Sequence, residues 1–280
     1  MTDGGLAAFL LPDGFAKPAV RAVLQEASVL TEAGRYAVAS REARRARRAA
    51  PYTGRRVVRS ADPVILVPGF LAGDATLAFM ARSLRQQGFR TYRSHIRANV
   101  GCTLNAAAQL ESRLESIVLR RGTRVQIVGH SLGGMLARGL AVRRPDLVSG
   151  IVTLGSPMLA PGAHHSALSF GVDMLVRLSR AGVPGLMSED CVGGSCARQS
   201  WDESREPMPD DVAFTAIYSK RDGICDWRAC VDPSATAVEV TASHVGMAVD
   251  PRVIEHVSAA LRRVADETAL PVEVDSGVGA

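Results

Sequence analysis

The segment Val125-Gln-Ile-Val-Gly-His-Ser-Leu-Gly-Gly134 is the part of the chain from which the fold is most directly inferred. It opens with apolar, β-branched residues around Gln126, which is typical of a strand buried in a sheet. Ser131 follows at the centre of a G-x-S-x-G pattern, and residues 132–142 then have helical spacing. A serine between a buried strand and a helix lies on a sharp turn that exposes its hydroxyl group. Gly129, Gly133 and Gly134 remove the side chains that so tight a turn would bring together.

Strands and helices alternate on both sides of this segment. Further strands are predicted at 63–67, 89–94, 151–154, 212–218 and 237–240, and helices at 76–87, 104–121 and 253–264. Strands that alternate with helices of this length form βαβ units, whose strands are parallel. The predicted fold class is therefore α/β, with a mostly parallel central sheet and helices on both of its faces.

The alternation is interrupted between residues 154 and 212. This interval is too long for a connecting loop, and it contains an apolar helical stretch at 168–178 followed by a tract rich in Gly, Pro and Cys. We expect an inserted cap, at about 158–211, over the edge of the sheet that carries Ser131. The predicted organisation is a helical, Arg-rich appendage at 1–60, a sheet domain at 61–268 and a C-terminal tail at 269–280.

Positive charge is concentrated in the N-terminal segment. The formal net charge is +5, and one stretch carries Arg41, Arg44, Arg45, Arg47, Arg48, Arg55, Arg56 and Arg59. Two interpretations stay open: a solvated helix packed loosely on the core, and an arm for a protein partner or for weak association with an anionic membrane surface. Because the excess charge is local, we expect no nucleic-acid partner.

The sequence predicts neither an export signal nor a membrane span. Residues 1–14 contain Asp3 and Asp13 and lack a basic start before an apolar run. No segment reaches the roughly 18–20 apolar residues that a spanning helix requires. We expect a soluble protein, cytoplasmic or attached to a membrane surface, and the compartment stays unknown.

A serine hydroxyl is a weak nucleophile without a base. His244 is the predicted base, because it follows the last predicted strand by a few residues and precedes the final helix. His256 falls inside that helix, and His130 lies within the serine turn, where its ring should point away from Ser131.

The acid that orients the base is expected after an earlier strand. Asp222 is the first carboxylate after the strand at 212–218, and Gly223 permits a sharp turn there. Asp226 and Asp232 lie on the same loop and remain alternatives, because aspartates are common in turns for structural reasons alone.

Two backbone N–H groups should face the oxyanion that forms when the serine attacks a carbonyl group. Leu132, the residue after the serine, is expected to supply one of them. Phe70, in the loop after the strand at 63–67, is expected to supply the other, since Gly69 lets that loop turn.

Together these motifs resemble the bacterial lipase and esterase branch of the α/β-hydrolase superfamily, over about residues 62–265. The matching segments are VPGFLAGD (67–74), VGHSLGG (128–134), LGSP (154–157), YSKRDGICDW (218–227) and ASHVGM (242–247). The resemblance implies an α/β-hydrolase fold with a cap, and a serine carboxylic-ester hydrolase that works through an acyl-enzyme without a metal or an organic cofactor. Many lipases begin the oxyanion loop with His-Gly. Here Pro68-Gly69 keeps the backbone donor but removes a histidine that often supports the loop.

The expected substrate is a small-molecule or lipid ester in an apolar pocket. The predicted substrate-binding residues are Leu71, Met135, Met158 and Leu175. An acyltransferase or thioesterase with the same triad is an alternative, because it would differ in water exclusion and acceptor binding only. A non-catalytic binding protein is a third hypothesis, disfavoured by the complete set of Ser, His, Asp and Gly residues.

The five cysteines form two C-x4-C pairs, Cys191/Cys196 and Cys225/Cys230, with Cys102 alone. Two local disulfides, or one between the pairs, suit an oxidising compartment, whereas free thiols suit a reducing one. A four-thiolate zinc site is only weakly indicated by this spacing. We expect the two local disulfides, Cys102 as a free thiol, and no metal site.

Overall fold

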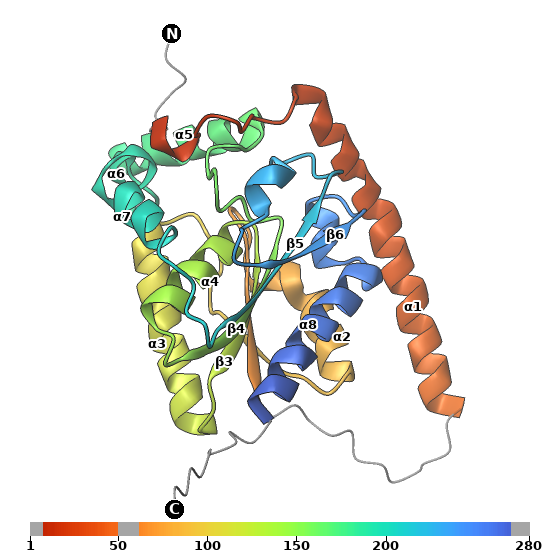
Figure 1. The fold of residues 1–280 in the computed structure, drawn as a ribbon. Helices are drawn as coiled ribbons and strands as arrows, with labels where there is room; N and C mark the ends of the chain where they lie inside the picture. The colour runs from red at the N-terminus through yellow and green to blue at the C-terminus, as the bar shows by residue number, and fades with distance from the viewer. Residues whose placement is uncertain (1–7, 50–61, 270–280) are drawn as a thin grey trace, which may run out of the picture.

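Six parallel strands form one sheet through the centre of the molecule (Figure 1). The computed structural model describes residues 8–49 and 62–269. The strands are β1 (Pro63–Val67), β2 (Arg90–Arg93), β3 (Val125–His130), β4 (Val148–Leu154), β5 (Ala213–Ser219) and β6 (Thr236–Val240). Their order is β2-β1-β3-β4-β5-β6, and every neighbouring pair is parallel. The predicted α/β class and parallel sheet are confirmed.

Helices cover both faces of this sheet because successive side chains of its central strands point to opposite sides. On β1, Val64 and Leu66 pack with residues of α2 (Ala78–Gln86) and α8 (Pro251–Ala269). Ile65 and Val67 pack on the other side with α3 (Thr103–Arg121) and α4 (Leu132–Arg143). Burial on both faces accounts for the uninterrupted apolar sequence of β1.

The observed elements follow the predicted ones closely, with a few differences at their ends. Helix α3 ends at Arg121, as predicted, and the following Gly122 adopts the left-handed conformation (φ 70°). Strand β4 begins at Val148, three residues before the predicted start, because Ser149 and Gly150 interrupt the apolar run without ending the strand. Helix α8 extends beyond its predicted bounds at both ends.

Between β4 and β5, where a cap is predicted, the chain forms α5 (Ser166–Arg180), α6 (Glu189–Gly193) and α7 (Ser195–Glu203). Figure 1 shows α5, α6 and α7 grouped at one end of the sheet. Helix α7 packs against α3 and α4, and residues of α5 line a cavity that reaches Ser131. The interval therefore covers the carboxyl end of β3.

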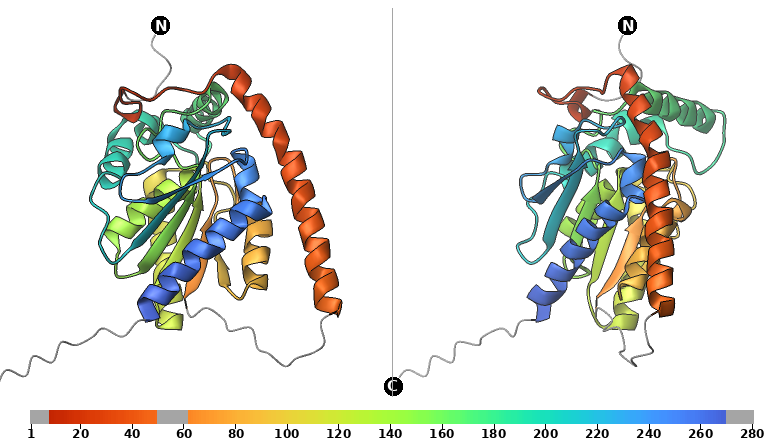
Figure 2. Two further views of the ribbon diagram at one scale, coloured as in Figure 1. Left: turned by 45° about the vertical axis from the view of Figure 1, so that its right-hand side comes forward. Right: turned by 90° about the vertical axis from the view of Figure 1, so that its right-hand side faces the viewer.

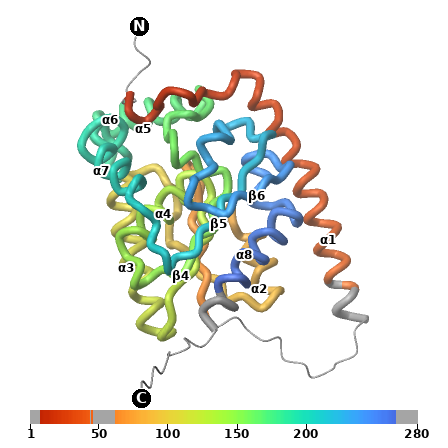
Figure 3. The backbone as a smooth tube through the Cα atoms, viewed as in Figure 1, coloured from red at the N-terminus to blue at the C-terminus, as the bar shows by residue number. Residues whose placement is uncertain are grey.

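The N-terminal segment begins with the short 3-10 helix η1 (Ala8–Leu10) and continues as η2 (Val20–Ser28) and α1 (Val29–Ala49). Helix α1 extends along the side of the molecule (Figures 2 and 3) and contacts α8 and η5 (Val245–Ala248). Tyr36 is buried in the core on this side, and Arg35 pairs with Asp250 at 2.8 Å. These contacts attach the segment to the sheet domain at specific residues.

Part of the predicted organisation lies outside the described residues. Arg41 and Arg45 are exposed on α1, but the side chains of Arg44, Arg47, Arg48, Arg55, Arg56 and Arg59 are not among those described. The predicted boundary at residue 60 and the tail after Ala269 also lie outside them. Of the described helices, none combines the length and the apolar character that crossing a membrane requires.

A buried ion pair connects α4 to the segment between β5 and β6. Arg138 donates to Asp232 at 2.8 Å, and both side chains are about 95% buried. Burial alone would raise the pKa of Asp232, but hydrogen bonds from Ser234 and Arg138 hold that pKa below its usual value.

We expect Asp232→Ala to lower the free energy of unfolding by about 3–5 kcal/mol, because it leaves the Arg138 charge buried without a partner. Asp211→Ala is the matched control. Its partner Arg124 lies at 2.6 Å, but the Asp211 side chain is 65% exposed. Loss of this exposed pair should cost at most about 1 kcal/mol. Urea denaturation of both variants measures the difference, and equal losses would contradict the assignment.

Candidate active site

Ser131 occupies a strained turn at the carboxyl end of β3. Its backbone has φ 53° and ψ −123°, outside the conformations that non-glycine residues normally adopt. Its N–H donates to the carbonyl of Leu154 on the neighbouring strand at 2.8 Å. A side chain at Gly129 would collide with the backbone of Gly134, so this turn requires glycine there. The geometry is that of a serine held at the start of α4 with its side chain directed off the sheet.

His244 and Asp222 meet at the same edge of the sheet. Nδ1 of His244 lies 2.6 Å from Oδ2 of Asp222, and both side chains are almost completely buried. The other carboxylate oxygen of Asp222 accepts from the N–H groups of Ile224 at 2.8 Å and Cys225 at 2.7 Å. Because a carboxylate only accepts, the proton of the imidazole lies on Nδ1, which leaves Nε2 as the basic nitrogen.

The two alternative carboxylates have other partners. Asp226 accepts from Arg228 at 3.0 Å and from the N–H of Ala16 at 3.2 Å. Asp232 pairs with Arg138. Of the three aspartates, Asp222 is the one that the structure places on His244.

The charges around His244 favour its protonated form. Burial lowers the pKa of the imidazole. The charge and hydrogen bond of Asp222, together with the charge of Glu26, raise this pKa by more than burial lowers it, so the pKa is above the ordinary value. His130 has the opposite balance, because burial and the nearby His244 lower its pKa to about 4. The neutral ring of His130 donates from Nε2 to the backbone carbonyl of His244 at 2.9 Å.

Two carboxylates of the N-terminal segment hold the same loops. Oε1 of Glu26 accepts from the N–H groups of Gly223 and His244, both at 3.0 Å, and Oε2 accepts from Val245 at 2.9 Å. Glu32 is buried and accepts from the N–H of Ser243 at 2.9 Å and from its hydroxyl at 2.7 Å. Glu26 therefore joins the loop that carries Asp222 to the loop that carries His244.

Neither Glu26 nor Glu32 is among the residues predicted from the sequence. They are the only acidic residues between Asp13 and Glu42, which is the one signal in the sequence that sets them apart. Gly155 belongs to the segment LGSP (154–157). It has φ 54°, and a Cβ there would lie 3.0 Å from both Oδ2 of Asp222 and Nδ1 of His244.

The loop after β1 is held in place by Asn99, a residue that was not predicted from the sequence. Asn99 is buried, and its side chain donates to the carbonyl of Pro68 at 3.0 Å. Its backbone accepts from Leu71 at 3.1 Å and donates to Ala72 at 2.8 Å. Across residues 8–49 and 62–269, no hydrogen bond engages the backbone N–H of Phe70 or of Leu132. Both residues line a cavity together with Ser131.

Two apolar cavities adjoin Ser131. The larger, about 340 Å³, is also lined by His244, Leu71 and Val245. The smaller, about 130 Å³, is lined by Leu132, Met135, Leu168, Val172 and Cys191 among others. Of the four predicted substrate-binding residues, Leu71 and Met135 line these cavities. Met158 is instead buried in the hydrophobic cluster that α3 and α4 form with the sheet, and Leu175 packs against the cluster of Val176, Met187 and Val192.

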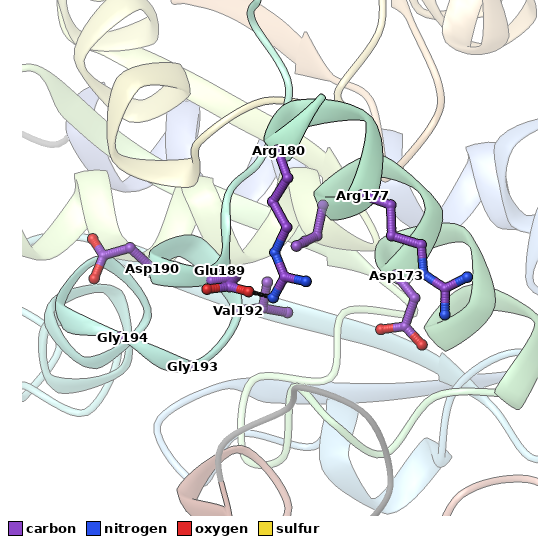
Figure 4. Close-up of a pocket in the computed structure, with 9 residues that line it drawn as sticks. Asp173, Arg177, Arg180, Glu189, Asp190, Val192, Gly193 and Gly194 are labelled. Carbon is purple, nitrogen blue, oxygen red and sulfur yellow. Dashed lines mark ion pairs between the residues drawn. The ribbon is translucent and has the colours of Figure 1, made fainter. Parts of the chain in front are cut away.

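A third cavity, of about 640 Å³, lies between α5 and α6 and does not reach Ser131. Figure 4 shows the charged side chains around it, including the ion pair of Arg180 with Glu189. Val192 lines both this cavity and the smaller apolar one. Helix α6 therefore separates a polar hollow on the surface from the apolar space beside Ser131.

The five cysteines, all within the described part of the chain, are free thiols, so the predicted disulfides are not observed. Cys225 and Cys230 are buried beside the acid loop, and burial together with the charge of Asp222 raises the pKa of both thiols well above the ordinary value. Cys102, predicted to stand alone, lies next to Cys196, because the start of α3 meets the cap. Spacing along the chain could not reveal this contact.

Residues 64–278 match the model of the alpha/beta hydrolase family. A curated triacylglycerol lipase of Vibrio cholerae serotype O1 (strain ATCC 39315 / El Tor Inaba N16961) is 33% identical over 100 residues. That match covers 33% of this chain and 31% of the lipase, so it spans about a third of the relative.

Two solved structures have a similar fold. The mature form of Bacillus licheniformis lipase BlEst2 has a TM-score of 0.57 at 14% identity and covers 72% of this chain and 92% of its own. The monoacylglycerol lipase of Paleococcus ferrophilus has a TM-score of 0.52 at 17% identity, over 75% of this chain and 96% of its own. With the parallel sheet and the serine turn, the match over residues 64–278 confirms the predicted membership: the chain belongs to the alpha/beta hydrolase family.

Proposed function

We propose that the chain is a serine carboxylic-ester hydrolase, an esterase or lipase, with Ser131 as nucleophile, His244 as base and Asp222 as orienting acid. The observation that carries the proposal is the buried 2.6 Å contact between His244 and Asp222. His244 lines a cavity together with Ser131, whose backbone conformation is strained. This combination fits acyl transfer to an activated hydroxyl group.

The reaction proceeds in two halves. Nε2 of His244 takes the proton of Ser131 as Oγ attacks the ester carbonyl, and the N–H groups of Phe70 and Leu132 bind the oxyanion. His244 then gives the proton to the leaving alcohol, and an acyl-enzyme remains. In the second half His244 deprotonates a water molecule, which attacks the acyl carbon and releases the carboxylic acid and free Ser131.

The substrate class follows from the two cavities. Their linings are mainly apolar, so both the acyl group and the alcohol group of the ester should be apolar. The smaller cavity suits the acyl chain, because it lies beside Leu132, one of the two proposed oxyanion donors. The names of the relatives, a triacylglycerol lipase and a monoacylglycerol lipase, support a lipid ester.

Ser131→Ala should abolish turnover of p-nitrophenyl esters of every chain length, with kcat reduced by about 10⁶-fold. An organophosphonate probe should label Ser131 in the original protein and nothing in the variant. Ser258→Ala is the matched control, because Ser258 is also buried but lies in α8, with its hydroxyl on the carbonyl of Glu255. Turnover in a folded Ser131→Ala variant would refute the proposed function.

Asp222→Asn should reduce kcat by about 10⁴-fold, because the amide no longer holds the required tautomer of His244. Asp226→Asn should reduce it by less than about tenfold, since Asp226 serves Arg228 instead. Steady-state kinetics on one ester compares the two variants. The opposite order of effects would make Asp226 the acid.

The rate should also depend on pH through His244. The base must be neutral to act, so kcat/KM should fall as the pH is lowered through a pKa above the ordinary value of about 6.5. Glu26→Gln removes a negative charge that favours the protonated imidazole, and the acidic limb should therefore move to lower pH. Glu239→Gln is the control, because the side chain of Glu239 is exposed and pairs with Lys220. An identical profile for both variants would show that Glu26 has no effect on the base.

A further inference from the structure

Three cysteines from different elements converge beside the smaller apolar cavity. Cys102 immediately precedes α3, Cys191 lies in α6, and Cys196 lies in the first turn of α7. The sulfur atoms of Cys102 and Cys196 are 3.8 Å apart, and all three sulfurs lie within 4.8 Å of one another. All three thiols are partly accessible to solvent. None of the three takes part in the proposed ester hydrolysis.

We propose that Cys102, Cys191 and Cys196 form a binding site for one Zn²⁺ ion, with the three sulfurs as thiolate ligands. Zinc–sulfur bonds of about 2.3 Å in a tetrahedral arrangement separate two sulfurs by about 3.8 Å, the distance between Cys102 and Cys196. A disulfide would use two of the three sulfurs and give no account of the third. An ion uses them all.

The local structure brings the sulfurs together. The carboxylate of Asp190 accepts from the N–H groups of Ser195 at 2.7 Å and Cys196 at 3.3 Å, which fixes the turn between α6 and α7. A side chain at Gly194 would collide with this carboxylate. Figure 4 shows Asp190 on the side of that turn, away from the pair of Arg180 and Glu189. The turn directs Cys191 and Cys196 toward the same point.

The surroundings favour the thiolate at Cys102 and oppose it at Cys196. Cys102 lies at the N-terminus of the 19-residue helix α3, whereas the carboxylate of Asp190 beside Cys196 raises the pKa of that thiol to about 12. The partial positive charge of a helix N-terminus stabilises a thiolate, the form of cysteine that binds a metal. The fourth coordination position is open to water, because the three thiols are only partly buried.

A bound ion would attach the cap to the sheet domain. Cys191 and Cys196 belong to the cap, whereas Cys102 belongs to the segment that leads from β2 into α3. Cys191 also lines the smaller cavity together with Ser131. The ion would therefore fix the position of α6 as one wall of that cavity. Binding of the ion itself does not depend on the proposed ester hydrolysis.

The test begins with the full chain purified under reducing conditions. Elemental analysis should find one zinc per chain. Replacing the zinc with Co²⁺ alone should produce sulfur-to-cobalt charge-transfer absorption and the intense visible bands of a tetrahedral site. Cys102→Ser, Cys191→Ser and Cys196→Ser should each weaken zinc binding by more than about 100-fold, more than the loss of an outer-shell partner costs. Cys230→Ala removes a buried thiol outside the cluster and should leave zinc binding unchanged.

Three outcomes would overturn the proposal. One is a protein with five free thiols and no affinity for Zn²⁺. Another is a disulfide, Cys102–Cys196 or Cys191–Cys196, found by peptide mapping of the protein purified without reductant and persisting when Zn²⁺ is supplied. If the serine variants fail to fold, the cobalt spectrum of the unaltered chain decides, and absence of the charge-transfer absorption counts against the site. Ester turnover is measured separately, so that failure of the zinc site and failure of the proposed function are distinguished.

Discussion

The parallel pairing of β3, β4, β5 and β6 is the constraint on which the rest of the site depends. Parallel strands end at the same edge of a sheet, so the residues that follow them are brought together however far apart they are in the chain. Ser131 follows β3, Asp222 follows β5 and His244 follows β6. The hydrogen bond between His244 and Asp222 joins residues 22 positions apart in the sequence, but the strands that precede them, β5 and β6, are neighbours in the sheet.

Periodicity along the sequence was sufficient to predict most of this framework. The apolar runs of β1 and β3 are buried on both faces, so their composition alone identifies them, and Gly122 marks the end of α3. The contact between Asp222 and His244 could be predicted because position after a strand is itself a property of the sequence. Boundaries were missed where polar or small residues, such as Ser149, occupy a buried strand.

The remaining features depend on contacts between distant segments, which leave little trace in a single sequence. Met158 is an apolar residue of the kind expected in a substrate pocket, but it lies in the core. Cys102 contacts the predicted cap, which begins more than fifty residues later in the chain. Glu26 and Glu32 lie in a segment whose most visible property is its arginines. Their function is defined by the backbone N–H groups of loops about 200 positions away.

The contacts of Glu26 also bear on how the protein reaches its native state. The carboxylate that accepts a hydrogen bond from His244 precedes it by 218 residues. A helix synthesised early therefore forms this contact only after one of the last loops has been synthesised. Contacts of such long range form late, because closing the intervening chain costs entropy before the contact can repay it. The sheet can therefore assemble before the loops around His244 acquire their final hydrogen bonds. A shortened chain starting at β1 would retain every recognisable motif of the family and still lack the two carboxylates that accept hydrogen bonds from the loops around Asp222 and His244.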